Sequence, residues 1–275
     1  MRYGVALGGG GAKGLAHIPM LEVLEKAGIR PSAVAGTSIG AIIGALYASG
    51  MSPGAMREAV DELTRVPRTL RDLIRAGQNG QLFDWLDFID LDIARGSLLN
   101  IEKFLSDFEK VAGVSRFEDL KIPLKVVATD FWKREEVIFA SGELGPAIAA
   151  SFALPGIFKP MVENGRVLID GGLVNPVPYD TLQEECDVVI AIDVIGHRRP
   201  GEDLLPSYTE SLFNSFQIAQ KAVLKSKFRI RPPDIYVDVA IEGIKVLEFH
   251  RVQEIYEQTA SACRELEEKL AAIGR

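Results

Sequence analysis

The segment Gly36-Thr37-Ser38-Ile39-Gly40 places a serine between two glycines, at the boundary between a strand-like and a helix-like stretch of sequence. Residues 33–37 form a short apolar run typical of a buried strand, and residues 39–49 form a nearly all-apolar run typical of a helix. A G-x-S-x-G turn between a strand and a helix holds the serine hydroxyl out at the edge of a sheet. The helix N-terminus favours negative charge at that point. The pattern predicts a nucleophile at Ser38, and an ordinary helix N-cap serine is the alternative.

A second candidate is the glycine run that follows the predicted strand 3–7. Glycines occupy positions 8–11 and 14, with Lys13 between them. Because side chains are absent from most of this loop, its backbone N–H groups can converge on an anion. In an acyl hydrolase, that anion is the oxyanion of the tetrahedral intermediate.

The same glycines permit a nucleotide-binding alternative, because Gly9, Gly11 and Gly14 satisfy the G-x-G-x-x-G fingerprint. That fingerprint expects an acidic residue at the end of the second strand, and residues 29–39 contain neither Asp nor Glu. The P-loop pattern also fails, since Lys13 is followed by glycine rather than by Ser or Thr. The combination with the serine turn therefore favours hydrolysis over nucleotide binding.

A serine nucleophile needs a neighbouring group that accepts its proton. Among the three histidines, His17 falls in the first turn of a predicted helix, and His250 falls on the polar side of the last predicted helix. His197 is the stronger competitor because it follows a predicted strand. The charged neighbours at 198–199 indicate an exposed loop instead.

Three aspartates end predicted strands and are the remaining candidates for the base: Asp130, Asp170 and Asp193. Asp170 precedes Gly171-Gly172, which allow a tight turn and a close approach of another segment, whereas the other two are expected to cap turns or helices. A free aspartate has a pKa of about 3.9 and is a weak base, so desolvation must raise that pKa. The pattern favours Asp170.

Three segments taken together resemble the patatin-like phospholipase family: GGGGAKG at 8–14, GTSIG at 36–40 and DGG at 170–172. ASFALPGIFKP at 150–160 and GGLVNPVP at 171–178 are similar to the family as well. The resemblance implies a three-layer α/β/α fold with a mainly parallel central sheet, and a Ser38–Asp170 dyad in place of a triad. It also implies hydrolysis of lipid acyl esters without a metal or cofactor. The oxyanion segment would map onto Gly9, Gly10, Gly11 and Lys13.

Two positions depart from the family pattern: Lys13 stands where many members carry Arg, and Pro19 stands where glycine is common. A lysine keeps the positive charge but loses the planar fork of a guanidinium group. Pro19 affects the prediction of where the first helix begins.

The elements expected to position these residues follow the βαβ pattern of a parallel sheet. Further strands are predicted at 124–129, 167–169, 188–192 and 235–239, with a hairpin partner at 136–140. Helices are predicted at 14–27, 146–154, from Ser207 onward, and at 248–273. We expect one domain over residues 1–275, with residues 53–119 as a helical, lid-like insertion.

Composition narrows the class of partner. The 275 residues carry a net charge of -7, which argues against nucleic acid, whose binding needs a basic surface. A lipid or ester is the expected substrate. A basic stretch over 221–231 allows a transient contact with a membrane surface, but a solvated helix end is the favoured interpretation of these charges. Two isolated cysteines, no signal-peptide pattern and no apolar run of about 20 residues predict a cytoplasmic protein. A regulatory protein with little activity is the remaining alternative.

Overall fold

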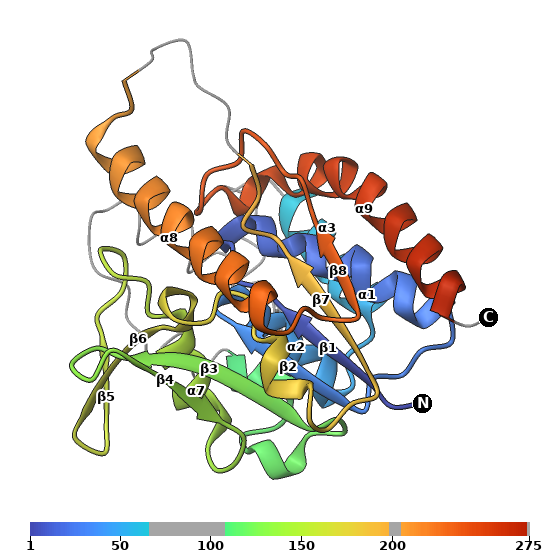
Figure 1. The fold of residues 1–275 in the computed structure, drawn as a ribbon, viewed down its shortest axis with the longest axis horizontal. Coiled ribbons are helices and arrows are strands. Elements are labelled where there is room, and N and C mark those ends of the chain that lie inside the picture. The colour runs from blue at the N-terminus through green and yellow to red at the C-terminus, as the bar shows by residue number, and fades with distance from the viewer. Residues whose placement is uncertain (66–107, 198–204, 274–275) are drawn as a thin grey trace, which may run out of the picture.

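The computed structural model describes residues 1–65, 108–197 and 205–273, and its centre is a sheet of eight described strands (Figure 1). The order of hydrogen-bonded neighbours is β5-β6-β3-β2-β1-β7-β8, with β4 paired to β3. The strands are β1 Tyr3–Leu7, β2 Ala33–Thr37, β3 Leu124–Asp130, β4 Glu135–Phe139, β5 Met161–Glu163, β6 Arg166–Asp170, β7 Val188–Asp193 and β8 Ile235–Asp238.

Helices cover both faces of this sheet, which gives three layers, α/β/α (Figure 1). One face carries α1, α2 and α9, and the other carries α8. The described helices are η1 Gly11–Ala16, α1 His17–Lys26, α2 Ile39–Ser49, α3 Pro53–Arg65, η2 Phe117–Asp119, α7 Leu144–Phe152, η3 Gly171–Leu173, η4 Tyr179–Leu182, α8 Tyr208–Ile230, η5 Phe249–Arg251 and α9 Val252–Ile273.

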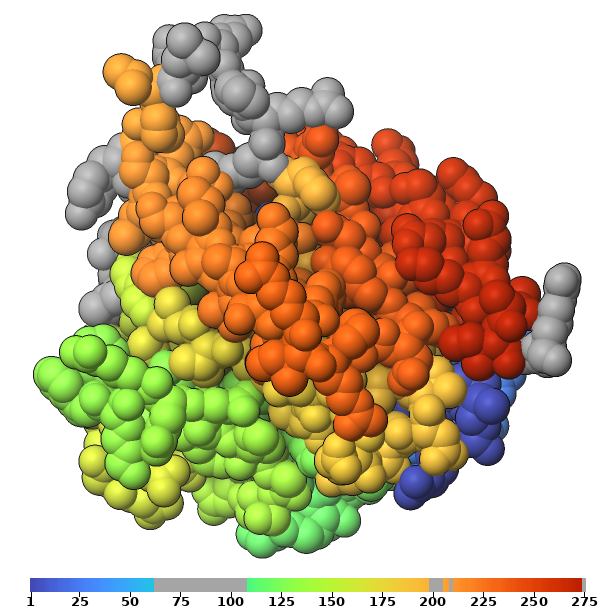
Figure 2. All heavy atoms as spheres, in the orientation of Figure 1, coloured from blue at the N-terminus to red at the C-terminus, as the bar shows by residue number. Residues whose placement is uncertain are grey.

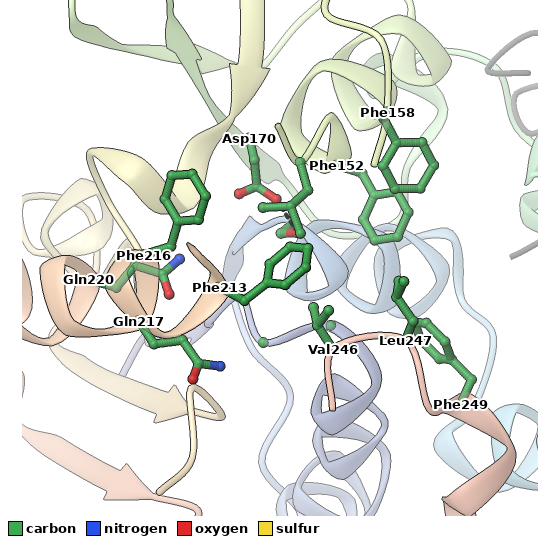
Figure 3. A pocket seen from close by; sticks show the side chains of 15 residues that line it. Phe152, Phe158, Asp170, Phe213, Phe216, Gln217, Gln220, Val246, Leu247 and Phe249 are labelled. Carbon is green, nitrogen blue, oxygen red and sulfur yellow. Dashed lines mark hydrogen bonds between the residues drawn. The ribbon is translucent and has the colours of Figure 1, made fainter. Parts of the chain in front are cut away.

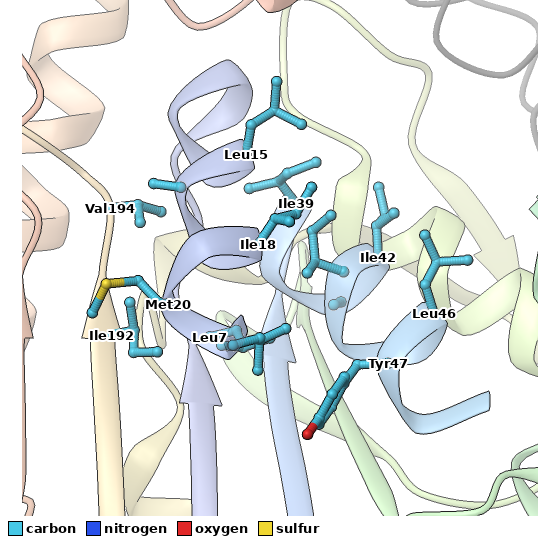
Figure 4. Close-up of a cluster of buried hydrophobic side chains, with 14 of the residues drawn as sticks. Leu7, Leu15, Ile18, Met20, Ile39, Ile42, Leu46, Tyr47, Ile192 and Val194 are labelled. Atoms are coloured by element: carbon cyan, nitrogen blue, oxygen red, sulfur yellow. The ribbon is translucent and has the colours of Figure 1, made fainter. Parts of the chain in front are cut away.

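Successive residues of a strand point to opposite faces of the sheet, and the side chains on the two faces differ in size. On β1, Val5 and Leu7 join the large cluster under α1 and α2, whereas Ala6 joins a second cluster on the other face, which contains side chains of η4 and α8. The same alternation recurs on β2 and β7, whose alanines belong to this second cluster. Figure 4 shows the large cluster, in which side chains of α1 and α2 such as Ile18 and Ile42 meet those of β1 and β7.

The carboxyl ends of β2 and β6 meet at one point of the sheet. Residues 126–127 of β3 pair with both β2 and β4, so these two strands lie on opposite edges of β3. Residues 128–130 pair with both β4 and β6, so β6 continues along the edge that β2 occupies. Because β2 is parallel to β3 and β6 is antiparallel, their C-terminal ends converge: Thr37 pairs with Val127, and Asp170 pairs with Ala128.

Most predicted elements are present, with differences at their ends. The strands at 3–7 and 33–37 and the helix at 39–49 are confirmed to the residue, and the predicted hairpin is β3–β4. The helix predicted from Gly14 begins instead as a 3-10 turn at Gly11, and the last helix is likewise preceded by a 3-10 turn, η5. Strand β5 was not predicted. Of the predicted insertion 53–119, α3 is a helix and η2 is a short turn, and residues 66–107 lie outside the described residues.

Candidate active site

Ser38 lies on a strained turn between β2 and α2. Its φ of 56° and ψ of -126° are unusual for a residue other than glycine, and strain of this kind needs support from the surrounding structure. Gly36 and Gly40 make this turn possible, because a side chain at either position would collide with neighbouring backbone. A Cβ at Gly40 would lie 2.1 Å from the carbonyl oxygen of Leu7, and one at Gly36 would lie 2.5 Å from backbone atoms of α2. The Ser38 side chain does not cap α2, so its hydroxyl is free for another partner.

That partner is Asp170. The Ser38 Oγ donates to Asp170 Oδ2 at 2.6 Å, and both residues are buried. The second carboxylate oxygen accepts from the backbone N–H of Gly172 at 2.7 Å, which fixes the orientation of the carboxylate. Burial raises the pKa of Asp170 to about 6, although the hydrogen bonds from Ser38 and Gly172 act in the opposite direction. The carboxylate is therefore a stronger base than a solvated aspartate.

Two buried polar side chains hold the turn in place. Ser151, on α7, accepts from the N–H of Ser38 at 2.8 Å and donates to the Val127 carbonyl at 2.5 Å. Thr37 donates to the carbonyl of Asn175 at 2.8 Å, which ties the end of β2 to the loop after Asp170. Sequence reasoning did not single out Ser151 or Asn175. Both lie within the segments 150–160 and 171–178 that carry the family resemblance, which was the available signal.

The glycine loop lies beside the serine, but its N–H groups differ in availability. Gly8 and Gly9 donate to the carbonyls of Ile192 and Pro176 at 3.0 and 2.9 Å. Among the described residues, no acceptor is bound by the N–H of Gly10 or of Gly11. Of the three glycines predicted for an oxyanion site, two therefore retain free donors, and Gly9 does not.

The side chains of Lys13 and His17 hold the glycine loop in place. The Lys13 ammonium is buried and donates to the carbonyl of Ile195, so this contact turns it toward the end of β7. His17 Nε2 donates to the Gly8 carbonyl at 2.8 Å. Burial lowers the pKa of His17 to about 4, so the imidazole is neutral at ordinary pH. In this position His17 supports the loop and does not hydrogen-bond to Ser38.

The competing bases lie elsewhere. His197 is exposed, and its Nε2 is 3.2 Å from Asp238 rather than near the serine. His250 is exposed and belongs to η5. Asp130 accepts from two N–H groups of the turn that follows it, and buried Asp193 accepts from Lys221, Tyr236 and the N–H of Ile195. Asp170 is thus the carboxylate that the fold brings to Ser38.

The serine, the aspartate and the free glycine donors share one pocket, which has an empty volume of about 600 Å³, part of it open to solvent. Its other walls are largely aromatic and aliphatic (Figure 3). They come from α7 and the segment after it, from α8, and from the segment before α9: Phe152, Leu154, Phe158, Phe213, Phe216, Val246, Leu247 and Phe249. An apolar pocket with few polar groups at one point is the usual form of a small-molecule site.

Two further features concern metals and membranes. Across residues 1–65, 108–197 and 205–273, no three His, Cys, Asp or Glu side chains gather as they would around a metal ion. In the same ranges, no helix combines the length and the apolar character needed to cross a membrane.

Comparisons with known proteins agree with this geometry. Residues 5–182 match the family model described as patatin-like phospholipase. An uncharacterized NTE family protein of Mycobacterium tuberculosis is 32% identical over 78% of this chain and 55% of its own. The lysophospholipase nte1 of Aspergillus fumigatus is 29% identical over 98% of this chain and 18% of its own. The chain thus spans about half the length of the first relative and about a fifth of the second.

The fold comparison points the same way. The crystal structure of VipD from Legionella pneumophila matches 96% of this chain and 67% of that chain, with a TM-score of 0.50 and 15% identity. At that identity, the match concerns the fold alone. The family match covers both the glycine loop and the serine turn, and it includes Asp170. The chain belongs to the patatin-like phospholipase family.

Proposed function

We propose that the chain is a serine hydrolase of lipid carboxylic esters, with Ser38 as the nucleophile and Asp170 as the base. The observation that carries this proposal is the 2.6 Å hydrogen bond from Ser38 Oγ to the buried Asp170 carboxylate, at the wall of an apolar pocket. Nucleophile and base within hydrogen-bonding reach are the structural signature of an activated hydroxyl.

In the first half of the reaction, Ser38 Oγ attacks the ester carbonyl carbon while Asp170 takes its proton. The new C–O bond forms as the carbonyl electron pair moves onto oxygen. When the tetrahedral intermediate collapses, the bond to the alcohol breaks, and Asp170 returns the proton to the leaving oxygen. The raised pKa of Asp170, about 6, favours this double role because a general acid–base works best with a pKa near the operating pH.

We assign the oxyanion donors to Gly10 and Gly11. Their N–H groups are unused by the described residues and border the same pocket as Ser38, whereas the N–H of Gly9 is held by Pro176. The N-terminus of α2 adds a favourable dipole at this point. Removing one oxyanion donor typically costs about 3 kcal/mol of transition-state stabilisation. Lys13 acts indirectly, by holding the loop to the end of β7.

In the second half, water attacks the acyl-enzyme. Asp170 takes a proton from that water, the C–O bond to Ser38 breaks, and the proton passes to Ser38 Oγ. The products are a free fatty acid and the regenerated hydroxyl. Each step uses groups of this chain together with water.

The pocket walls support a fatty acyl chain as the part of the substrate that is bound. The rings of Phe152 and Phe158 are tilted against each other on one side of the pocket, with their centroids 4.9 Å apart, and further apolar side chains come from the segment before α9. The name of the fungal relative, lysophospholipase, supports a lipid ester as the substrate class.

A transient contact with a lipid surface is also proposed. Leu205, Leu212 and Ile218 are exposed by 86%, 39% and 64%, and they lie on or just before α8, whose inner side borders the pocket. Figure 2 shows α8 (orange) on the outer surface of the molecule. With a net charge of -7, a zwitterionic surface suits the chain better than an anionic one. The variant Ile218→Glu is expected to weaken co-sedimentation with phosphatidylcholine vesicles, and unchanged binding contradicts the contact.

The basic stretch over 221–231 contributes less to such a contact than its charge suggests. Lys221, Lys227 and Arg231 pair with acidic side chains of neighbouring elements. Lys225, Arg229 and Arg231 are exposed, and the first two form no ion pair with the described residues.

The extent and location of the functional unit are proposals as well. We propose one domain over residues 1–275, because α9 near the C-terminus packs on α1 and η1 near the N-terminus. A cytoplasmic location is proposed from the two cysteines, Cys186 and Cys263, which are both free.

The test is turnover of short p-nitrophenyl esters. We expect Ser38→Ala and Asp170→Asn to lose activity, while Ser49→Ala, which removes a hydroxyl at the other end of α2, keeps it. Full activity in either of the first two variants contradicts the dyad. A wild-type protein that reacts with a fluorophosphonate at Ser38 but turns over no ester favours a regulatory protein with this fold. ATP or NAD binding without ester turnover favours the nucleotide-binding alternative.

A further inference from the structure

The active-site pocket has two chemically different sides. Phe152 and Phe158 lie on one side of Asp170, and the amides of Gln217 and Gln220 lie on the other (Figure 3). Both glutamines belong to α8 and are three residues apart, so they share a face of that helix. An ester bound at Ser38 has two parts, an acyl chain and an alcohol, and the two sides of the pocket match this division.

The two amides are available to a ligand. Both side chains are half-buried in the pocket wall, and neither has a hydrogen-bond partner among the described residues. An amide offers one acceptor and two donors, which suits a hydroxyl group that both donates and accepts. The amides therefore border the pocket with unused hydrogen-bonding capacity on an otherwise largely apolar wall, and Gln217 also borders a neighbouring surface hollow.

Gln220 is also held close to the dyad. A Cβ at Gly172 would lie 2.4 Å from the Gln220 Nε2 and 3.0 Å from Asp170 Oδ1. The second glycine of Asp170-Gly171-Gly172 thus leaves room for this amide directly over the turn that carries the base. A group bound by Gln220 would therefore lie beside Asp170, which returns the proton to the leaving alcohol in the proposed mechanism.

The charge of the pocket further restricts which class of alcohol the ester can contain. Among the described lining residues there is no lysine or arginine, and Asp170 is the charged side chain. An anionic group next to the scissile bond would meet this carboxylate without a cation to balance it. Hydroxyl groups meet the two amides without such repulsion.

We propose that Gln217 and Gln220 form the subsite for the alcohol part of the substrate, and that this part is a glycerol moiety with free hydroxyl groups. This inference rests on the proposed hydrolase function and adds the chemical class of the leaving group. The glycerol moiety occurs in both monoacylglycerols and lysophospholipids, and the two differ in whether a phosphodiester follows it.

The test compares esters of one acyl chain that differ only in the alcohol: methyl laurate, monolauroylglycerol and lauroyl lysophosphatidylcholine. The variants are Gln217→Met and Gln220→Met, which keep side-chain length while removing the amide. We expect each to lower kcat/KM for the glycerol esters about tenfold, since a substrate hydroxyl then lacks its partner. The loss should appear mainly in KM, because the amide binds substrate and transition state alike. Methyl laurate should change less than twofold.

The matched control is Asn214→Leu, which removes an amide from the same helix at a position that borders a neighbouring surface hollow instead. The control should leave all three esters unchanged. The rate of fluorophosphonate labelling of Ser38 should stay the same in all variants, and it reports an intact dyad in a folded protein. Wild-type preference between the two glycerol esters shows whether a phosphodiester is accepted beyond the glycerol.

Outcomes separate this inference from the proposed function. Equal losses for the methyl and glycerol esters, or no loss in either glutamine variant, overturn the glycerol subsite while the hydrolase stands. A wild-type protein that neither labels nor cleaves any of the three esters overturns the hydrolase itself.

Discussion

The substitution Asp170→Asn is expected to abolish ester turnover and, at neutral pH, to stabilise the fold. The residue Asp170 is 3% exposed, and burial raises the pKa of its carboxyl from 3.8 to about 6. The folded chain therefore holds this proton more tightly than the unfolded chain does. An asparagine keeps the shape of the side chain and an oxygen that can accept from Gly172, and it has no proton to lose.

The sign and size follow from proton linkage. Between pH 4 and 6, Asp170 ionises in the unfolded chain before it does so in the folded chain, so the free energy of unfolding falls as pH rises. Above about pH 6 both states are ionised, and the penalty stays constant. A shift of about 2 units corresponds to about 3 kcal/mol. The stability of Asp170→Asn minus that of wild type should rise by this amount from pH 4 to pH 6 and then level off.

Urea unfolding of both proteins at several pH values from 4 to 7.5 measures this difference. Other groups that titrate in the same window are present in both proteins and cancel. The control is Ser38→Ala, which is also expected to be inactive but keeps the carboxyl. Because the Ser38 hydrogen bond lowers the pKa of Asp170, the control should still lose stability as pH rises. A stability difference between Asp170→Asn and wild type that does not change with pH refutes the desolvated base.

Three further predictions concern pH and the supports of the turn. The kcat/KM for neutral esters should rise with pH through an apparent pKa of about 6 as Asp170 ionises, and a flat profile from pH 5 to 8 contradicts it as base. Ser151→Ala leaves the buried N–H of the nucleophile without its acceptor, so urea unfolding should show a loss of about 1–3 kcal/mol and kcat should fall; a silent substitution argues against this support. The pKa of His17 is lowered from 6.5 to about 4, so wild type should lose about 3 kcal/mol relative to His17→Gln as pH falls through that window. Parallel pH curves for the two proteins would contradict this burial effect.

The sequence predicted the elements around the serine well because their signals are local. The strand before Ser38 is a short apolar run, and the helix after it ends at Gly50, which adopts a left-handed conformation. Both features depend on neighbouring residues alone. The capping box of Ser207 and Glu210 at the start of α8 was predicted for the same reason and is present.

What the sequence could not supply depends on pairing between distant segments. Strand β6 is an apolar run in the sequence, but its antiparallel direction is set by pairing with β3. That direction brings the C-terminal end of β6, with Asp170, next to the C-terminal end of β2, which precedes Ser38. Strand β5 has three residues, none of them fully buried, so its pattern is too short to detect.

The glycine loop illustrates a second limit. Four successive glycines offer equivalent N–H groups in the sequence, and tertiary contacts decide which remain free. The carbonyls of Ile192 and Pro176, both far along the chain, bind the N–H groups of Gly8 and Gly9. Lys13 appeared suited to an anion site, yet its ammonium binds the carbonyl of Ile195.

Covalent labelling tests the central claim most directly. A fluorophosphonate reacts with a serine hydroxyl only where a base activates it, and peptide mass spectrometry locates the adduct. We predict one adduct on Ser38 in the wild-type protein, and labelling slowed by orders of magnitude in Asp170→Asn although that variant is folded. An adduct at another residue, or a Ser38 that labels equally fast without the Asp170 carboxylate, contradicts the account.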